Sequence, residues 1–183
     1  MNRMLGAVLA GGASRRFGSD KALAKIHGMS LIDHAITSLK DIADAIVICG
    51  RPYPGALHLP DRPTADIGPL GGLNAALHYG KYNGCSSVLT VPCDTPFIPL
   101  AALSDLAKQN GPWFVAEHPV IGVWPTSLAD DLDRLLQDNN DRSMRKWARQ
   151  SGARPFPIRG IVNINYREDL NHLLTTEGRQ SPE

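Results

Sequence analysis

Short apolar runs alternate with longer segments of helical periodicity along most of this 183-residue chain. The runs are nearly continuous in apolar character, as is typical of strands that are covered on both faces. The expected strands are residues 5–9, 45–49, 87–91, 113–116, 119–124 and 160–163. Helices are expected over residues 30–44, over residues 70–79 with Gly80 near the C-terminus, and over SLADDLDRLLQD, with Ser127 and Asp130 as a capping box. The alternation predicts an α/β fold, in which a three-layer α/β/α sandwich contains a Rossmann-like, mostly parallel sheet.

The length of the chain is typical of one domain, which we expect over residues 1–175, with a disordered tail over residues 176–183. The net charge of +1 argues against a broad nucleic-acid or membrane surface. The first apolar segment is too short for a signal peptide, and no apolar stretch is long enough to span a bilayer. Cys49, Cys85 and Cys93 lack zinc-like spacing, so we expect buried free thiols in a reducing cytoplasm. A monomer is expected because no large apolar surface stripe is evident.

The chain leaves its first expected strand through the segment LAGGASRRFGSDKA. Gly11 and Gly12 allow the backbone to approach a ligand closely, and successive N–H groups in such a loop bind anions. Arg15, Arg16 and Lys21 add positive charge that suits phosphate groups. The segment is neither a Walker loop nor a dinucleotide fingerprint. It predicts a polyphosphate-binding loop at the carboxyl end of a strand, the alternative being a flexible turn with solvated charges.

A second polar element, in the segment SSVLTVPCDTPFIP, places Asp94 directly beyond an apolar strand that Pro92 should end. A carboxylate at this position suits Mg²⁺, which takes one or two protein carboxylates together with water and substrate phosphates. The alternative is an aspartate that forms an Asx turn. Asn163 and Asn165 lie on one face of a later extended segment, where an amide oxygen could complete the Mg²⁺ shell or cap the following helix.

Other polar residues are weaker candidates. Asp61 could contact a ribose or a base edge or form local turn bonds, whereas a turn role is favoured for Asp66. Glu117, His118 and Trp124 are possible contacts for an acceptor molecule. The basic segment NNDRSMRKWARQ is either a solvated face or an acceptor-phosphate site, and its cations are Arg142, Arg145, Lys146 and Arg149.

The motifs together resemble a known family of enzymes. LAGGASRRFGSDKA is similar to the signature of nucleotidyltransferases that begin LAGG-x-S-x-R-M-G-x-D-K. Within that group, GPLGGL, PCDTPFIP and NINYREDL resemble the molybdenum cofactor guanylyltransferases, which make molybdopterin guanine dinucleotide. The resemblance implies the fold of the nucleotide-diphospho-sugar transferases, Mg²⁺ as cofactor, and GTP and molybdopterin as substrates. It also implies transient contact with proteins that deliver and accept the cofactor, and no nucleic-acid or membrane partner.

The resemblance also implies roles for individual residues. The implied nucleotide-binding residues are Leu9, Ala10, Gly11, Gly12, Lys21, Asp61 and Asp94. The implied catalytic residues are Lys21, Asp94 and Arg16, and the implied metal ligand is Asp94, with Asn165 as a lesser candidate. Two other functions stay open: a cytidylyltransferase of the same fold, acting on molybdopterin or a sugar, and a non-catalytic nucleotide or cofactor carrier.

Overall fold

The computed structural model describes residues 3–11, 17, 20–138, 142–166 and 168–170. The strands of its main sheet are β1 (Met4–Leu9), β4 (Ala45–Cys49), β5 (Leu57–Leu59), β6 (Ser87–Pro92), β7 (Trp113–Phe114), β8 (Gly122–Pro125) and β9 (Arg154–Pro155). Their order is β5-β4-β1-β6-β8-β7-β9, and the short strands β2 (Lys25–Ile26) and β3 (Met29–Ser30) form a separate pair. Strand β8 runs antiparallel to β6 and β7, whereas the other pairs in the main sheet are parallel. The mostly parallel sheet is therefore confirmed.

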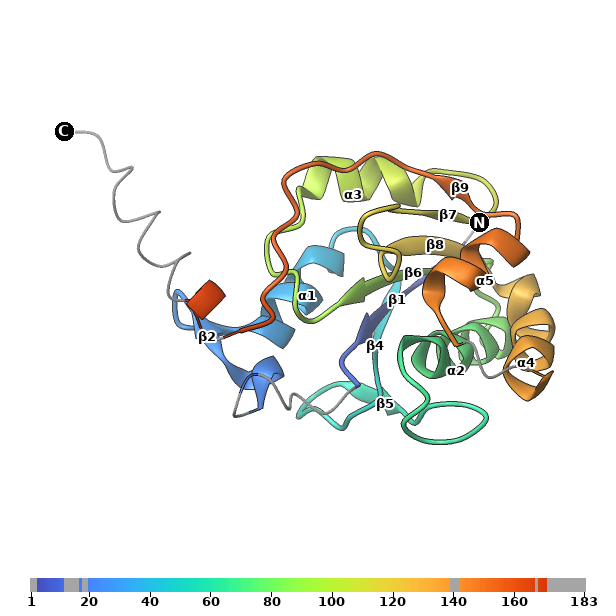
Figure 1. Cartoon of the computed structure of the whole chain (residues 1–183), viewed down its shortest axis with the longest axis horizontal. Coiled ribbons are helices and arrows are strands. Elements are labelled where there is room, and N and C mark those ends of the chain that lie inside the picture. The colour runs from blue at the N-terminus through green and yellow to red at the C-terminus, as the bar shows by residue number, and fades with distance from the viewer. Residues whose placement is uncertain (1–2, 12–16, 18–19, 139–141, 167, 171–183) are drawn as a thin grey trace.

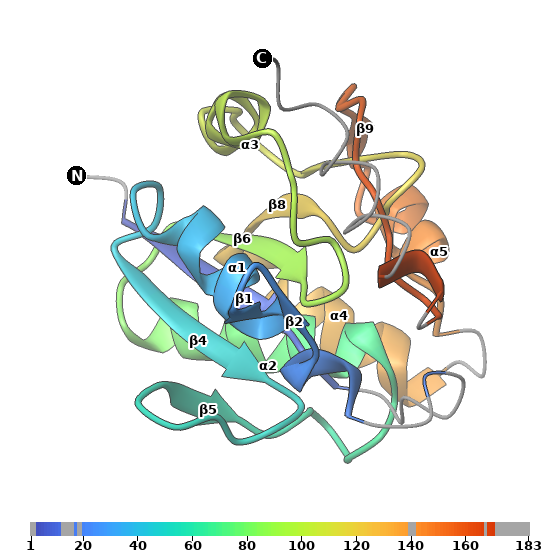
Figure 2. The same ribbon diagram turned by 90° about the vertical axis from the view of Figure 1, so that its left-hand side faces the viewer.

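Helices cover both faces of the sheet, which confirms the three-layer sandwich (Figure 1). Helices α2 (Pro69–Tyr82), α4 (Ala129–Asp138) and α5 (Met144–Gln150) pack on one face. Helices α1 (Leu31–Leu39) and α3 (Leu100–Ala107) pack on the other, as Figure 2 shows from a second direction. Successive strand residues point to opposite faces, so Leu5, Ala7 and Leu9 enter one core while Val8 enters the other. Among the described residues, no helix is long and apolar enough to cross a membrane.

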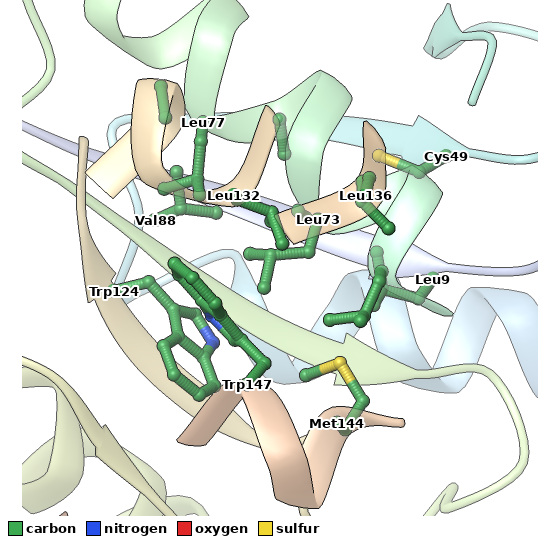
Figure 3. Close-up of a cluster of buried hydrophobic side chains, with 14 of the residues drawn as sticks. Leu9, Cys49, Leu73, Leu77, Val88, Trp124, Leu132, Leu136, Met144 and Trp147 are labelled. Atoms are coloured by element: carbon green, nitrogen blue, oxygen red, sulfur yellow. The ribbon is translucent and has the colours of Figure 1, made fainter. Parts of the chain in front are cut away.

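The core under α2 and α4 is closed by two tryptophans (Figure 3). Trp124 on β8 and Trp147 on α5 are buried, with ring centroids 6.4 Å apart. The Trp124 indole nitrogen donates a hydrogen bond to Thr90 Oγ1 at 3.1 Å, so its polar atom is satisfied inside the core. Trp124 is thus a packing residue, and its expected role as an acceptor contact is wrong.

Helix α1 begins as the sequence predicts but ends five residues earlier. Ser30 caps it by accepting a hydrogen bond from the Asp33 backbone N–H at 3.2 Å. After Leu39 the chain turns, because Asp44 must pair with Met4 at the start of β1. The Asp44 N–H donates to the Met4 carbonyl at 2.9 Å, and the Asp44 carboxylate accepts from the Met4 N–H at 2.7 Å.

One helix is longer than predicted, and one predicted helix start is wrong. Helix α2 continues past the predicted end at Tyr79 to Tyr82, with Gly80 near its C-terminus as expected. A Cβ on Gly80 would come within 3.1 Å of Thr126 Cγ2, so this glycine also serves close packing. Ser127 does not open α4, because residues Thr126–Leu128 already form a 3₁₀ turn ahead of that helix.

The expected strand over residues 160–163 does not form. Instead, the Ile164 N–H donates to the Asp94 carbonyl at 2.8 Å, a single bond that ties this segment to the loop after β6. The other expected strands form, although β7 and β8 are shorter because residues 115–121 form the turn between them. The sequence did not predict the short strands β2, β3, β5 and β9. The expected domain over residues 1–175 stays a prediction, and the expected tail lies outside the described residues.

Candidate active site

A pocket of about 330 Å³ opens at the carboxyl ends of β4, β1 and β6. Strand β1 is the point at which the strand order reverses, because β4 lies on one side of it and β6 on the other. Ligands of open α/β sheets bind at such points. The strand order also places the turn between β7 and β8 at this edge, so the pocket is lined by segments that lie far apart in the sequence.

The structure brings most of the predicted site residues to this pocket. Its lining includes Leu9, Ala10, Gly11, Lys21, Asp61, Asp94 and Asn163. Asn165 does not line it but hydrogen-bonds to Lys21. Gly12, Arg15 and Arg16 lie outside the described residues.

Lys21, Asp94 and Asn165 form what we call the Lys21 cluster. The Lys21 ammonium lies 3.1 Å from Asp94 Oδ2 and donates to Asn165 Oδ1 at 3.3 Å. The lysine and aspartate side chains are 13% and 25% exposed, so water screens this ion pair only partly. The bond from Ile164 to the Asp94 carbonyl holds the asparagine segment in place. The Asn165 side chain therefore contacts the Lys21 ammonium. The following turn is capped by Asp169, whose carboxylate accepts hydrogen bonds from the backbone N–H groups of residues 165 and 166.

The Lys21 cluster suits a divalent cation. The oxygens of Asp94 and Asn165 converge on one positive group, the lysine ammonium, which marks a place that stabilises a cation. Carboxylate and amide oxygens are the ligands that Mg²⁺ takes, together with water and phosphate oxygens. No group of three or more His, Cys, Asp or Glu side chains gathers around a possible metal position in the described ranges. A metal held by Asp94 and Asn165 would therefore draw its other ligands from substrate and water.

The opposite wall of the pocket is built by close backbone packing, and we call it the glycine wall: Gly11, Gly50, Gly71 and Gly72. A Cβ on Gly50 would lie 2.5 Å from the Cα of Gly11, and one on Gly72 would lie 2.9 Å from the Cβ of Cys49. These contacts leave no room for side chains, so the ends of β1 and β4 and the start of α2 meet directly. Gly11 and Gly72 line the pocket, so the wall presents backbone at these two positions, where a flat or ribose-like group could approach closely.

Asp61 lies against the glycine wall and faces the pocket. A Cβ on Gly71 would come within 2.9 Å of the Asp61 Cβ, so the missing side chain makes room for this aspartate. Burial raises the pKa of Asp61, the nearby Asp66 charge raises it further, and a hydrogen bond from the Asp66 backbone lowers it. The carboxylate is thus partly desolvated, as a group that accepts hydrogen bonds from a ligand would be.

The far end of the pocket is formed by the turn between β7 and β8. The His118 N–H donates to the Val115 carbonyl at 3.0 Å, and the Ile121 N–H donates to the His118 carbonyl at 2.8 Å. These bonds fix Glu117 and His118 at the pocket lining, as expected of acceptor contacts. Arg145 and Arg149 of the basic segment are exposed on α5 and do not line the pocket, so their role stays a prediction.

Two lining groups have properties that the sequence did not reveal. Arg51, which follows β4, forms an ion pair with Asp20, the residue before Lys21. The only sequence signal was an arginine just beyond a strand that reaches the ligand-binding edge.

Cys93 is adjacent to Asp94, but burial raises the pKa of its thiol to about 12, so it is not a thiolate nucleophile at neutral pH. Cys49, Cys85 and Cys93 are all free, as expected, and the first two are buried.

Comparisons with known proteins agree with this geometry. The profile of the family described as MobA-like NTP transferase domain matches residues 6–154. A molybdenum cofactor guanylyltransferase from Acidiphilium cryptum (strain JF-5) is 32% identical over 181 residues, which cover 90% of each chain.

Solved structures share the fold. Molybdopterin-guanine dinucleotide biosynthesis protein A from Archaeoglobus fulgidus superimposes with a TM-score of 0.74 at 21% identity, covering 97% of this chain and 100% of that one. Rv0371c from Mycobacterium tuberculosis H37Rv, solved in complex with manganese, superimposes with a TM-score of 0.66 at 14% identity, covering 96% of this chain and 100% of that one. The match to the family profile extends over most of the chain and includes the pocket edge, and the chain therefore belongs to the family of MobA-like NTP transferase domains.

Proposed function

We propose that this protein transfers GMP from GTP to the terminal phosphate of molybdopterin, forming molybdopterin guanine dinucleotide and releasing pyrophosphate. The observation that carries the proposal is the Lys21 cluster, which lies at the switch point of the sheet between the glycine wall and the β7–β8 turn. The relative from A. cryptum, which carries the name of this activity, supports it over nearly the whole chain.

The two ends of the pocket suit two substrates. The nucleoside of GTP would lie against the glycine wall, where Asp61 accepts hydrogen bonds from hydroxyl or amino groups. The backbone of Leu9, Ala10, Gly11 and Gly12 would contact the nucleotide, and Lys21 and Arg16 would bind its phosphates. Molybdopterin would enter past Glu117 and His118, so that its phosphate meets the triphosphate near Lys21.

The reaction is an in-line displacement at the α-phosphorus of GTP. An oxygen of the molybdopterin phosphate forms the new bond to this phosphorus, and the bond to the oxygen that bridges the α- and β-phosphates breaks. That oxygen leaves with the pyrophosphate. No general base is required, because the attacking phosphate oxygen is already deprotonated. The protein's contribution is to bring two polyanions together and to stabilise their charge with Lys21 and Arg16.

We infer that the resident cofactor is Mg²⁺, held by Asp94 with help from Asn165. Bound there, the ion supplies Lewis-acid polarisation of phosphate oxygens. Lys21, whose ammonium lies beside Asp94, would bind phosphate oxygens of the nucleotide. We further propose a cytoplasmic monomer that contacts cofactor-delivering and cofactor-accepting proteins transiently.

Pyrophosphate release tests the proposal directly. Purified protein is given Mg²⁺, molybdopterin and each of the four ribonucleoside triphosphates in turn. We expect release with GTP that depends on molybdopterin and is much slower with ATP, CTP and UTP. Preference for CTP would indicate a cytidylyltransferase. Tight binding of GTP without pyrophosphate release would indicate a carrier, and either result would overturn the proposal.

A further inference from the structure

We propose that Arg51 is a positioning residue, which fixes the Lys21 ammonium at Asp94 by holding the carboxylate of Asp20. The inference rests on the proposed function, since Lys21 is the group whose placement matters. It assigns a role to a side chain that comes from the β4–β5 connection and not from the phosphate-binding loop.

The contact between Arg51 and Asp20 is bidentate. Each terminal nitrogen of the guanidinium lies 2.5 Å from one carboxylate oxygen, NH1 from Oδ1 and NH2 from Oδ2. Two parallel hydrogen bonds fix the orientation of both planar groups, which a single contact would not do. The hydrogen bond to Arg51 also lowers the pKa of Asp20, so the carboxylate stays ionised at neutral pH.

Asp20 passes this restraint to Lys21 through the backbone. It stands directly before the 3₁₀ turn Lys21–Leu23, and its carbonyl accepts a hydrogen bond from the Leu23 N–H at 3.1 Å. The Asp20 carboxylate also interacts favourably with the Ala22 backbone N–H inside the turn, which lowers the pKa of Asp20 and links the carboxylate to the turn itself. The lysine side chain is long and flexible. The position of the Lys21 backbone therefore determines how precisely the ammonium can be placed at Asp94.

Arg51 is itself held at the pocket. Its side chain is 26% exposed and lines the pocket. Both terminal nitrogens face Asp20, and the buried Nε has no hydrogen-bond partner among the described residues. Two of the five N–H donors of the guanidinium, one on each terminal nitrogen, are therefore engaged by a carboxylate. This arrangement favours a role through Asp20 over direct contact with the nucleotide.

A double-mutant cycle separates these roles. The variants are Arg51→Gln, Asp20→Asn and the double substitution, assayed for kcat and for the KM of GTP. A matched control is Arg134→Gln, which removes an exposed ion pair with Asp131 on α4, away from the pocket. We expect each single substitution to lower kcat by about 10- to 100-fold, as misplacement of a reacting group does, and the double to lose no more than either single. The control should match wild type.

Other outcomes would overturn the inference. Independent, additive losses would mean that the two residues do not act as a unit. A raised KM for GTP in Arg51→Gln with a normal Asp20→Asn would mean that Arg51 contacts the nucleotide itself. Thermal unfolding verifies that each variant is folded, and Arg51→Lys with Asp20→Glu replaces any variant that is not. These substitutions keep the charges but lose the bidentate geometry, so the same reduction in kcat is expected.

A second readout does not require activity. Reductive methylation of Lys21, followed by peptide mass spectrometry, reports how firmly its ammonium is held at Asp94. We expect faster methylation in Arg51→Gln and Asp20→Asn than in wild type or Arg134→Gln. Unchanged methylation in an active enzyme overturns the positioning role. Faster methylation in a protein whose wild type releases no pyrophosphate overturns only the proposed function.

Discussion

The glycine wall and the Lys21 cluster face each other across one pocket but are built in different ways. The wall depends on the absence of side chains, since a Cβ at Gly50 or Gly72 would come within 3 Å of a neighbouring atom. The cluster depends on charge, with the Lys21 ammonium donating hydrogen bonds to two acceptor oxygens, one of Asp94 and one of Asn165. Shape therefore controls one half of the site and electrostatics the other. Changes in the wall should affect folding and binding, whereas changes in the cluster should affect the rate with the fold intact.

The largest effect is expected from Asp94→Asn. Asparagine keeps the shape and one acceptor oxygen, so the hydrogen bond to Lys21 can persist while the negative charge is lost. We expect Mg²⁺-dependent pyrophosphate release to fall by about 10³-fold or more, since charge stabilisation of the reacting phosphates contributes several kcal/mol. Activity is measured over a Mg²⁺ titration, and circular dichroism verifies the fold. Full activity at ordinary Mg²⁺ would place the metal elsewhere.

The next effect is expected from Lys21→Ala, which removes the cation of the cluster. The loss in kcat/KM should be about 10² to 10³-fold, the range seen when one preorganised donor is removed. Because the side chain is anchored only by Asp94 and Asn165 among the described residues, the unfolding temperature should change little. Steady-state kinetics and thermal unfolding test both statements, and wild-type kinetics in this variant would contradict the assignment.

Gly50→Ala tests the wall. Gly50 has φ of +86°, and its added Cβ would lie 2.5 Å from Gly11, so we expect a loss of about 3 kcal/mol in unfolding free energy from strain and overpacking. Gly55→Ala is the matched control, because Gly55 has φ of +74° with no atom within 4 Å of the added Cβ. It should cost only about 1 kcal/mol. Equal losses in urea unfolding would show that the close approach to Gly11 is unimportant.

The smallest effect is expected from Asp61→Asn and concerns pH. The pKa of Asp61 is raised in the folded protein, chiefly by burial, so the folded state binds this proton more tightly than the unfolded chain. Folding stability is therefore lost as pH rises from the ordinary pKa through the raised one. The variant lacks this titration and should gain stability relative to wild type as pH rises above about 4, the ordinary pKa of an aspartate. Urea unfolding at several pH values measures the difference, which should be absent at the acid end.

The sequence predicted the sheet better than its connections. The apolar runs that became β1, β4 and β6 are buried on both faces, so composition alone marked them, and Pro92 marked the end of β6. The expected strand over residues 160–163 does not form, because this segment is tied to the protein by the hydrogen bond from Ile164 to the Asp94 carbonyl and not by a ladder of backbone hydrogen bonds to a neighbouring strand. Gly80 lies near the end of α2 as predicted, but it also packs closely against Thr126, a contact that periodicity does not encode.

The candidate site was predictable where residue type and position coincide. Lys21, Asp61 and Asp94 follow strands or glycine-rich turns in patterns that favour phosphate, ribose and metal. The role of Arg51 was not predictable, because its partner Asp20 is 31 residues away in the sequence and no local pattern around either residue indicates that the two side chains meet. Trp124 was misassigned because an indole near polar residues in the sequence can still be enclosed by a core that forms only in three dimensions.

The ion pair between Lys21 and Asp94 has a consequence for the order in which ligands arrive. In the free protein Asp94 Oδ2 already has a positive neighbour, so a metal ion that bound at this carboxylate, as we propose, would compete with the ammonium without offering it another partner. A triphosphate offers that partner, because its oxygens can take over the lysine. We therefore expect weak metal affinity in the free enzyme and strong mutual dependence between nucleotide and metal, with the lysine keeping the carboxylate neutralised until the nucleotide is present.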